Sequence, residues 1–256
     1  MSLPTFTTLG AGPTVLMLHG VAATHLAFAP QVESLAMAGY RAVAWDMPGY
    51  GVSPPIEPYT FKGLAERCIA LIHALQCPSV VLLGHDMGGM VAQEVVARRP
   101  ELVDKLVLCG TSPSYAAFDG MLVSQRAEAL HGTGDMEALA DMLVPQLVGP
   151  GSLPEGVRLA QHCMAQVHPS TFRRALQAMT AFDRDACLAN IHVPTLLVAG
   201  ERDRHATPEV MQRMGRSIPS STYVEMRGIG HLQNLEAPDD FDAAVLSFLA
   251  LPRLLH

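Results

Sequence analysis

Ten consecutive residues decide the fold: Val80-Val81-Leu82-Leu83-Gly84-His85-Asp86-Met87-Gly88-Gly89. The first four are apolar and predict a short buried strand, whereas the residues after Gly89 have the period of a helix. Between the two lies a Gly-x-Asp-x-Gly turn, from Gly84 to Gly88. A strand, a tight turn and a helix in this order form one unit of an α/β fold.

Similar units recur along most of the chain. Short apolar runs bounded by Gly and Pro predict strands at Val15–Leu18, Ala42–Trp45, Val80–Leu83, Leu106–Cys109, Leu196–Ala199 and Thr222–Glu225. Helices are predicted at about 28–38, 61–75, 89–98, 208–216 and 239–250, and Thr207-Pro208 has the form of an N-cap and first helical position. Strands that alternate with helices predict a mostly parallel central sheet flanked by helices.

The interval 113–191 breaks this alternation. Ala, Leu and Met recur there at helical spacing, and no convincing strand is visible. In open α/β sheets the loops at the carboxyl ends of the strands form the ligand crevice. We therefore predict a single-domain core, 1–112 and 192–256, with a helical cap at 113–191 over the active site.

Composition excludes several kinds of partner. Only 16% of the 256 residues are charged, the net charge is −7, and the 17 Lys and Arg residues are scattered, so we expect no nucleic-acid surface. Met1–Thr5 lacks a basic region leading into an apolar run, and no apolar stretch reaches the roughly 20 residues of a membrane span. We expect a cytoplasmic protein that does not bind membranes; a homodimer remains open.

The cysteines do not suggest a metal or redox site. There are five, Cys68, Cys77, Cys109, Cys163 and Cys187, and no two of them form a C-x-x-C pair. We expect reduced and mostly buried thiols, and we expect no metal ion.

The turn around Asp86 resembles the nucleophile elbow of the α/β-hydrolase superfamily, and the resemblance covers nearly the whole chain. It implies the α/β-hydrolase fold, with glycines that relieve crowding in the turn and push the side chain of Asp86 into the cleft. The elbow usually carries a serine. At the start of a helix Asp86 would feel the positive end of the backbone dipoles, which favours an ionised nucleophile. The alternative is an aspartate that merely caps the helix.

His19-Gly20-Val21, directly after the first predicted strand, is similar to the His-Gly turn of the same superfamily. The resemblance implies an oxyanion hole made by the backbone N–H groups of Val21 and Met87. His19 itself is interpreted as a structural residue of the turn. Another family-like loop, from Trp45 to Ser53, is expected to be architectural.

The resemblance also assigns an acid and a base. Asp203 follows the strand Leu196–Ala199 at the family position of the orienting acid, and Glu201 remains the alternative. His231, flanked by Gly230 after the strand Thr222–Glu225, matches the catalytic histidine, so the order nucleophile, acid, base is kept. His205 is interpreted as a loop residue.

An aspartate at the elbow implies the chemistry of epoxide hydrolases and of haloalkane or haloacid dehalogenases. Asp86 would form an alkyl ester, and water activated by His231 would hydrolyse it, without cofactor or metal. Haloalkane dehalogenases commonly have Trp after the nucleophile, where this chain has Met87, so epoxides are favoured over halides. Tyr115 is the candidate for the acid that protonates the epoxide, with the histidines His131, His162 and His168 as alternatives.

Residues 88–113 resemble serine-dependent enol-lactonases and carboxylic-ester hydrolases instead. We therefore predict a cofactor-independent hydrolase of a small, largely apolar substrate, epoxide hydrolase-like, whose partners are that substrate and water. Three alternatives remain: an ester or enol-lactone hydrolase scaffold with Asp in place of Ser, a dehalogenase, and a noncatalytic protein that binds a small molecule beneath the cap.

Overall fold

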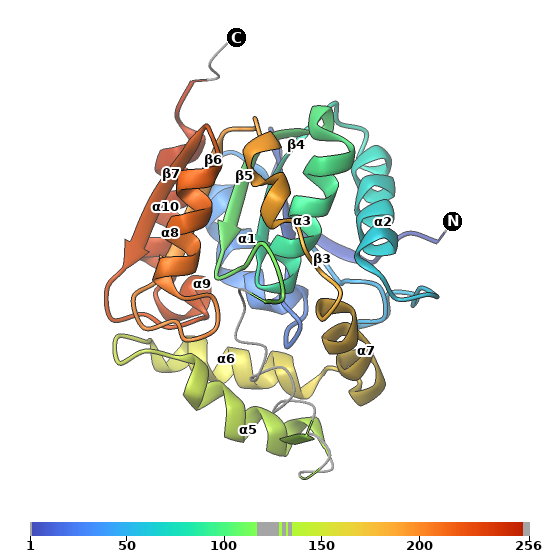
Figure 1. The fold of residues 1–256 in the computed structure, drawn as a ribbon, viewed down its shortest axis with the longest axis vertical. Helices are drawn as coiled ribbons and strands as arrows, with labels where there is room; N and C mark the ends of the chain where they lie inside the picture. Colours follow the sequence, from blue (N-terminus) through green and yellow to red (C-terminus); the bar gives the residue numbers. More distant parts are fainter. Residues whose placement is uncertain (1, 117–127, 130–131, 133–134, 253–256) are drawn as a thin grey trace.

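The computed structural model describes residues 2–116, 128–129, 132 and 135–252. At its centre is a seven-stranded sheet with the order β1-β3-β2-β4-β5-β6-β7 (Figure 1). The strands are β1 (Phe6–Leu9), β2 (Thr14–Leu18), β3 (Arg41–Trp45), β4 (Val80–His85), β5 (Val103–Cys109), β6 (Thr195–Gly200) and β7 (Ser221–Met226). All neighbours pair in parallel except β1 and β3. The predicted α/β fold is confirmed.

Each of the six predicted strands lies within an observed one, but β1 was missed. This short edge strand pairs antiparallel with β3, and Phe6 and Leu9 are 40% and 49% exposed. Because it is exposed along most of its length, it has no buried apolar run for a sequence pattern to detect.

Helices cover both faces of the sheet. They are α1 (Ala29–Met37), α2 (Phe61–Ala74), α3 (Met87–Arg98), α8 (Pro208–Ser217), α9 (Gln233–Glu236) and α10 (Pro238–Leu249), with 3-10 turns η1 (His25–Phe28) and η2 (Pro100–Leu102). Five of these helices were predicted; the short α9 was not. The predicted cap at Thr207 is confirmed, since its side chain accepts a hydrogen bond from the N–H of Val210.

Alternation along the strands divides the core into two layers. Leu16 and Leu18 of β2 pack in one cluster with side chains of α2, α3 and α8. Val15 and Met17 pack in a second cluster with side chains of α1 and α10. Successive side chains of a strand point to opposite faces, so one buried strand supplies both layers.

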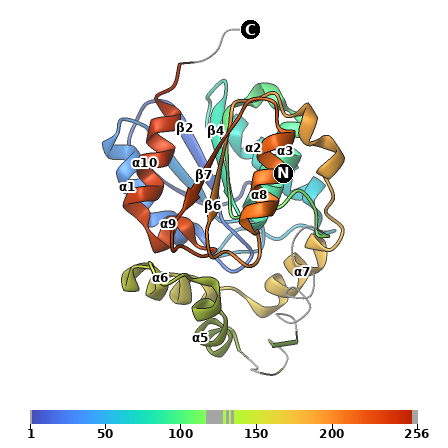
Figure 2. The ribbon, with the colours of Figure 1, turned by 60° about the vertical axis from the view of Figure 1, so that its left-hand side comes forward.

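The interval 113–191, called the insertion below, contains α5 (Met136–Leu147), α6 (Pro154–Ala165), α7 (Pro169–Met179) and the 3-10 turn η3 (Asp185–Asn190). Figures 1 and 2 show α5, α6 and α7 gathered beyond the end of the sheet towards which the strand arrows point. This is the edge at which the sequence places Asp86. The division into a core and a cap stays a prediction.

Within the described part of the chain, no helix has both the length and the apolar character needed to cross a bilayer. The five cysteines are free thiols, and Cys68, Cys109 and Cys163 are buried.

Candidate active site

Asp86 sits in a strained turn between β4 and α3. Its φ of +51° and ψ of −121° are unusual for a residue with a side chain. Close packing imposes this turn, because a Cβ atom on Gly88 would lie 2.0 Å from the carbonyl oxygen of Leu18, and one on Gly84 would lie 2.5 Å from that of Gly88. Asp86 occupies the N-cap position of α3, but its side chain makes no capping hydrogen bond. The carboxylate is therefore available to the site.

The two oxygens of the Asp86 carboxylate have different surroundings. Oδ2 accepts a hydrogen bond of 2.9 Å from the N–H of Val21. Oδ1 is buried and has no hydrogen-bond partner among the described residues. The nearest ring nitrogen, Nε2 of His231, is 3.8 Å away from it. A buried acceptor without a partner costs free energy, because its hydrogen bonds with water are lost and not replaced.

His231 and Asp203 form a buried pair next to this oxygen. Nδ1 of His231 lies 2.9 Å from Oδ2 of Asp203. Oδ1 of Asp203 accepts the N–H groups of His205 at 2.8 Å and Ala206 at 3.1 Å, which orients the carboxylate. A carboxylate at Nδ1 favours the tautomer with its proton on that nitrogen, so that Nε2 is unprotonated and can act as a base.

Glu201, the alternative acid, lies elsewhere. Its side chain accepts a hydrogen bond of 2.7 Å from the N–H of Gly228 at an exposed turn and pairs with Arg202 at 3.7 Å. The structure thus brings Asp203, and not Glu201, to the histidine.

Two further histidines pack on His231. The ring centroids of His85 and His205 lie 5.1 Å and 5.0 Å from that of His231. His85 Nε2 lies 2.8 Å from the carbonyl oxygen of His231 and donates to it. Burial, followed by the nearby His231, lowers the pKa of His85 to about 4, so its imidazole is neutral near pH 7. His205 lies in a loop, as predicted, and is buried there; no sequence spacing reveals ring packing of this kind.

The loop that carries Val21 is held from two sides. Nε2 of His19 accepts the N–H of Met47 at 3.0 Å, so Nδ1 carries the proton and donates to the carbonyl oxygen of Gly20 at 2.8 Å. The hydroxyl of Tyr50 donates to the carbonyl oxygen of Val21 at 2.9 Å. Both side chains are buried, and burial lowers the pKa of His19 to about 4. These contacts fix the position of the Val21 N–H.

Met87, the other predicted member of the oxyanion hole, is the first residue of α3. A backbone N–H at this helical position has no acceptor within the helix. Its contribution to the hole stays a prediction. The loop from Trp45 to Ser53 has the expected architectural contacts, because the hydroxyl of Ser53 donates to the carbonyl oxygen of Asp46 at 2.7 Å.

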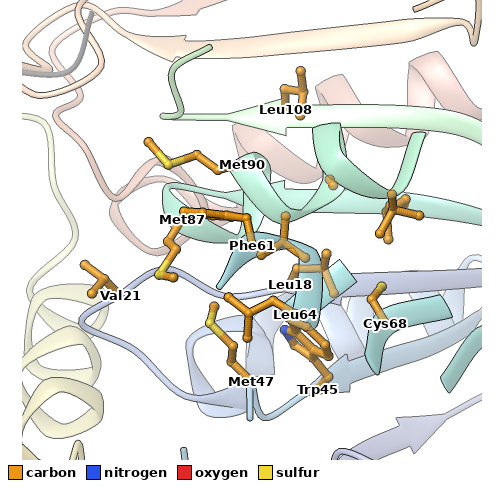
Figure 3. Close-up of a cluster of buried hydrophobic side chains, with 14 of the residues drawn as sticks. Leu18, Val21, Trp45, Met47, Phe61, Leu64, Cys68, Met87, Met90 and Leu108 are labelled. Carbon is orange, nitrogen blue, oxygen red and sulfur yellow. The ribbon is translucent and has the colours of Figure 1, made fainter. Parts of the chain in front are cut away.

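The site is bordered by apolar side chains. Figure 3 shows Val21, Met47 and Met87 in the core cluster that also contains Trp45 and Phe61. A cavity of about 30 Å³ lies between the insertion and the core, and its lining includes His85, Leu147, Cys163 and Leu232. Of these four lining residues, His85 is the only one with an imidazole, and Leu147 and Leu232 are apolar.

Tyr115 and three histidines of the insertion were the candidates for an additional acid. Tyr115 donates its N–H to the carbonyl oxygen of Phe182 at 2.9 Å, and its partly buried ring packs against the core. His162 and His168 are exposed. His131 lies outside the described residues. The assignment of Tyr115 stays a prediction.

Known proteins resemble the chain over almost its whole length. The sequence model of the family described as alpha/beta hydrolase fold matches residues 13–238. The chain is 30% identical over 254 residues to a pimeloyl-(acyl-carrier protein) methyl ester esterase of Nitrosospira multiformis, a match that covers 94% of this chain and 95% of the relative. It is 27% identical over 292 residues to the bifunctional epoxide hydrolase 2 of Rattus norvegicus, covering 95% of this chain and 53% of that longer protein.

A solved structure agrees with the fold. The enol-lactonase from Burkholderia xenovorans superposes with a TM-score of 0.87 at 24% identity, and the match covers 96% of each chain. The extent of the family match and the hydrolytic activities named for the relatives lead to one conclusion: the chain is a hydrolase and belongs to the alpha/beta hydrolase fold family.

Proposed function

We propose that this hydrolase acts on a small, largely apolar epoxide through a covalent ester on Asp86. The observation that carries the proposal is the asymmetry of the carboxylate. Val21 holds Oδ2, whereas Oδ1 is buried, has no hydrogen-bond partner in the described part of the chain and faces Nε2 of His231 at 3.8 Å. A carboxylate held in this way can attack with Oδ1 while Oδ2 already occupies the position where negative charge later develops.

In the first step Oδ1 of Asp86 attacks an sp³ carbon of the epoxide. A C–O bond forms, the ring C–O bond breaks, and the epoxide oxygen takes a proton from an acid, for which Tyr115 is our candidate. A carboxylate is already anionic near pH 7, so this step needs no general base.

In the second step Nε2 of His231 removes a proton from water, and the hydroxide attacks Cγ of the Asp86 ester. Negative charge develops on Oδ2, where the N–H of Val21 stabilises it, while Asp203 stabilises the imidazolium. The tetrahedral intermediate then collapses, and His231 gives its proton to the departing alkoxide. The carboxylic acid of Asp86 ionises again, and its proton restores the acid used in the first step.

We prefer epoxides over halides because Trp45 lies in the core and not where it could bind a departing halide. A departing halide needs polarised N–H donors, and indole is a common source. The only tryptophan of the chain is fully buried, its Nε1 has no hydrogen-bond partner among the described residues, and Figure 3 places it in the core cluster. We also propose that the insertion acts as a cap, which would exclude water from the first step.

The hydrolysis of an ester or lactone is the second candidate. The similarity to the methyl ester esterase, at 30% identity, favours it. Attack by Asp86 on an ester carbonyl would form an anhydride, a harder route than attack by a serine. On this hypothesis the scaffold would regain fast ester turnover in Asp86→Ser.

Intact-mass spectrometry separates the two candidates. His231→Gln is incubated with styrene oxide, a chloroalkane and p-nitrophenyl acetate, and Asp86→Asn serves as the matched control without a nucleophile. We expect an adduct of the mass of styrene oxide on His231→Gln that maps to Asp86, and none on the control. No adduct from either alkylating compound, together with a large gain of ester turnover in Asp86→Ser, would favour the esterase.

Three predictions from the sequence remain proposals. They are a cytoplasmic location, a lack of nucleic-acid and membrane partners, and a possible homodimer.

A further inference from the structure

Glu236, the last residue of α9, is a fully buried carboxylate surrounded by donors. Oε2 accepts the N–H of Gly149 at 2.7 Å, the N–H of Gly230 at 2.8 Å and the hydroxyl of Ser152 at 2.6 Å. Oε1 accepts the N–H of Leu232 at 2.8 Å. All four partners donate, and no described Lys, Arg or His lies within salt-bridge distance. The carboxylate thus organises backbone and hydroxyl donors and does not serve as half of an ion pair.

These donors come from two separate parts of the chain. Gly230 and Leu232 flank His231 on either side, whereas Gly149 and Ser152 belong to the segment of the insertion between α5 and α6. One side chain therefore joins the loop of the candidate catalytic histidine to the insertion.

Main-chain hydrogen bonds reinforce the same junction. The N–H of His231 itself donates to the carbonyl oxygen of Leu147 at 2.7 Å. The N–H of Gly151 donates to the carbonyl oxygen of Gly228 at 3.1 Å, and the N–H of Leu153 to that of Glu236 at 2.8 Å. We call residues 147–153 and 228–236 together the histidine seam.

Glycines allow the two segments of the histidine seam to approach closely. A Cβ atom on Gly149 would lie 2.1 Å from the carbonyl oxygen of Gly228, and one on Gly230 would lie 2.2 Å from that of Leu147. Contacts this close leave no space for a side chain, so the segments cannot slide past each other without losing hydrogen bonds.

We infer that Glu236 is a positioning residue that couples the insertion to His231 and sets where Nε2 stands relative to the Asp86 ester. It acts through the backbone of the histidine loop, and no contact joins it to Asp86 or to Val21. The inference about rates rests on the proposed function, in which His231 works only in the second step. Disturbing Glu236 therefore slows hydrolysis of the ester and leaves alkylation of Asp86 unchanged, a separation that general loss of structure does not produce.

Glu236→Gln is the sharpest variant. It keeps the shape and one acceptor oxygen, but it replaces the other oxygen with an NH2 group that cannot accept. At least one N–H of the histidine seam then loses its buried acceptor, which shifts local equilibria by about tenfold or more. Ser152→Ala removes one donor on the insertion side only and is the milder second variant. Glu94→Gln is the matched control, since Glu94 is a buried carboxylate that pairs instead with Arg98 and Arg184.

Rapid-quench mass spectrometry with styrene oxide gives the two rates. In Glu236→Gln we expect the alkyl-enzyme to accumulate, with hydrolysis slowed about tenfold or more and alkylation within about twofold of the parent. Ser152→Ala should show a smaller effect of the same kind, and Glu94→Gln none. Equal slowing of both steps in Glu236→Gln, or hydrolysis that stays at the parent rate, would overturn the inference.

Hydrogen–deuterium exchange tests the coupling without any substrate. Amides of both segments, 147–153 and 228–236, should exchange about tenfold faster in Glu236→Gln than in the parent, and those of the remaining chain should not. Acceleration in one segment only, or in neither, would contradict the coupling. If no protein variant forms an adduct, the proposed function fails, and the exchange result still decides whether Glu236 joins the two segments.

Discussion

Nδ1 of His231 lies 2.9 Å from Oδ2 of Asp203, whereas Nε2 of the same ring lies 3.8 Å from Oδ1 of Asp86. The first distance is a hydrogen bond and the second is too long for one. The ring is therefore hydrogen-bonded to Asp203 through Nδ1, whereas Nε2 faces Asp86 without hydrogen-bonding to it. This arrangement suits a base that acts on water after Asp86 has reacted.

Asp203→Asn should slow only the second step. An amide at this position presents N–H groups to Nδ1 and favours the tautomer whose Nε2 is protonated and cannot accept a proton. Hydrolysis of the alkyl-enzyme should fall by about 10³–10⁴-fold, with alkylation within a few-fold of the parent. Single-turnover kinetics measures both rates. Glu201→Gln is the control and should behave as the parent; the reverse pattern would mean that Glu201 is the acid.

Tyr50→Phe should weaken the oxyanion hole. It removes the hydroxyl that donates to the carbonyl oxygen of Val21 and leaves the ring in place. Loss of one buried hydrogen bond corresponds to about 1 kcal/mol, so hydrolysis should slow roughly fivefold. A rate equal to that of the parent in the same single-turnover assay would show that the Val21 N–H does not depend on this contact.

Asp86→Gly should stabilise the protein and abolish activity. The positive φ of Asp86 is strained for a side chain but not for glycine. The substitution also removes Oδ1, which is buried and has no hydrogen-bond partner among the residues that the structure describes. We expect the free energy of unfolding in urea to rise by about 1 kcal/mol. Gly84→Ala in the same turn should lower it, because its Cβ would meet the carbonyl oxygen of Gly88 at 2.5 Å. A loss of stability in Asp86→Gly would contradict the account of strain.

Acid should destabilise the fold through His19 and His85. Burial lowers both pKa values from 6.5 to about 4. Between pH 4 and pH 6.5 the unfolded chain therefore binds more protons than the folded chain. Their contribution to stability is complete above about pH 6.5 and is lost as the pH falls towards 4, by on the order of 2–3 kcal/mol for each histidine. Urea denaturation at several pH values measures this loss in the free energy of unfolding. His85→Asn, which can still donate to the carbonyl oxygen of His231, should show a shallower decline; an equal decline would exclude His85 as a cause.

The sequence predicted the parts of the site that depend on local backbone geometry. The elbow at Asp86 and the loops of Asp203 and His231 each follow a predicted strand, and parallel strands bring their carboxyl ends to one edge. The resemblance to the superfamily, which these local motifs carry, therefore identified residues that meet in space.

Long-range contacts left no comparable signal. Glu236 and Ser152 are 84 positions apart, and the histidine seam depends on the path of the insertion, which no short motif encodes. The burial of His205 against His231 left no signal for the same reason, although its prediction as a loop residue is confirmed. The edge strand β1 was missed because exposure removes the alternation on which strand prediction depends.

The covalent ester on Asp86 is tested most directly with the unaltered enzyme in water enriched in oxygen-18. With enzyme in excess over styrene oxide, so that each molecule turns over once, the heavy oxygen should enter the carboxylate of Asp86 and be absent from the diol, as peptide mass spectrometry and product analysis would show. Heavy oxygen in the diol and none in Asp86 would mean that water attacks the substrate directly and would contradict the covalent mechanism.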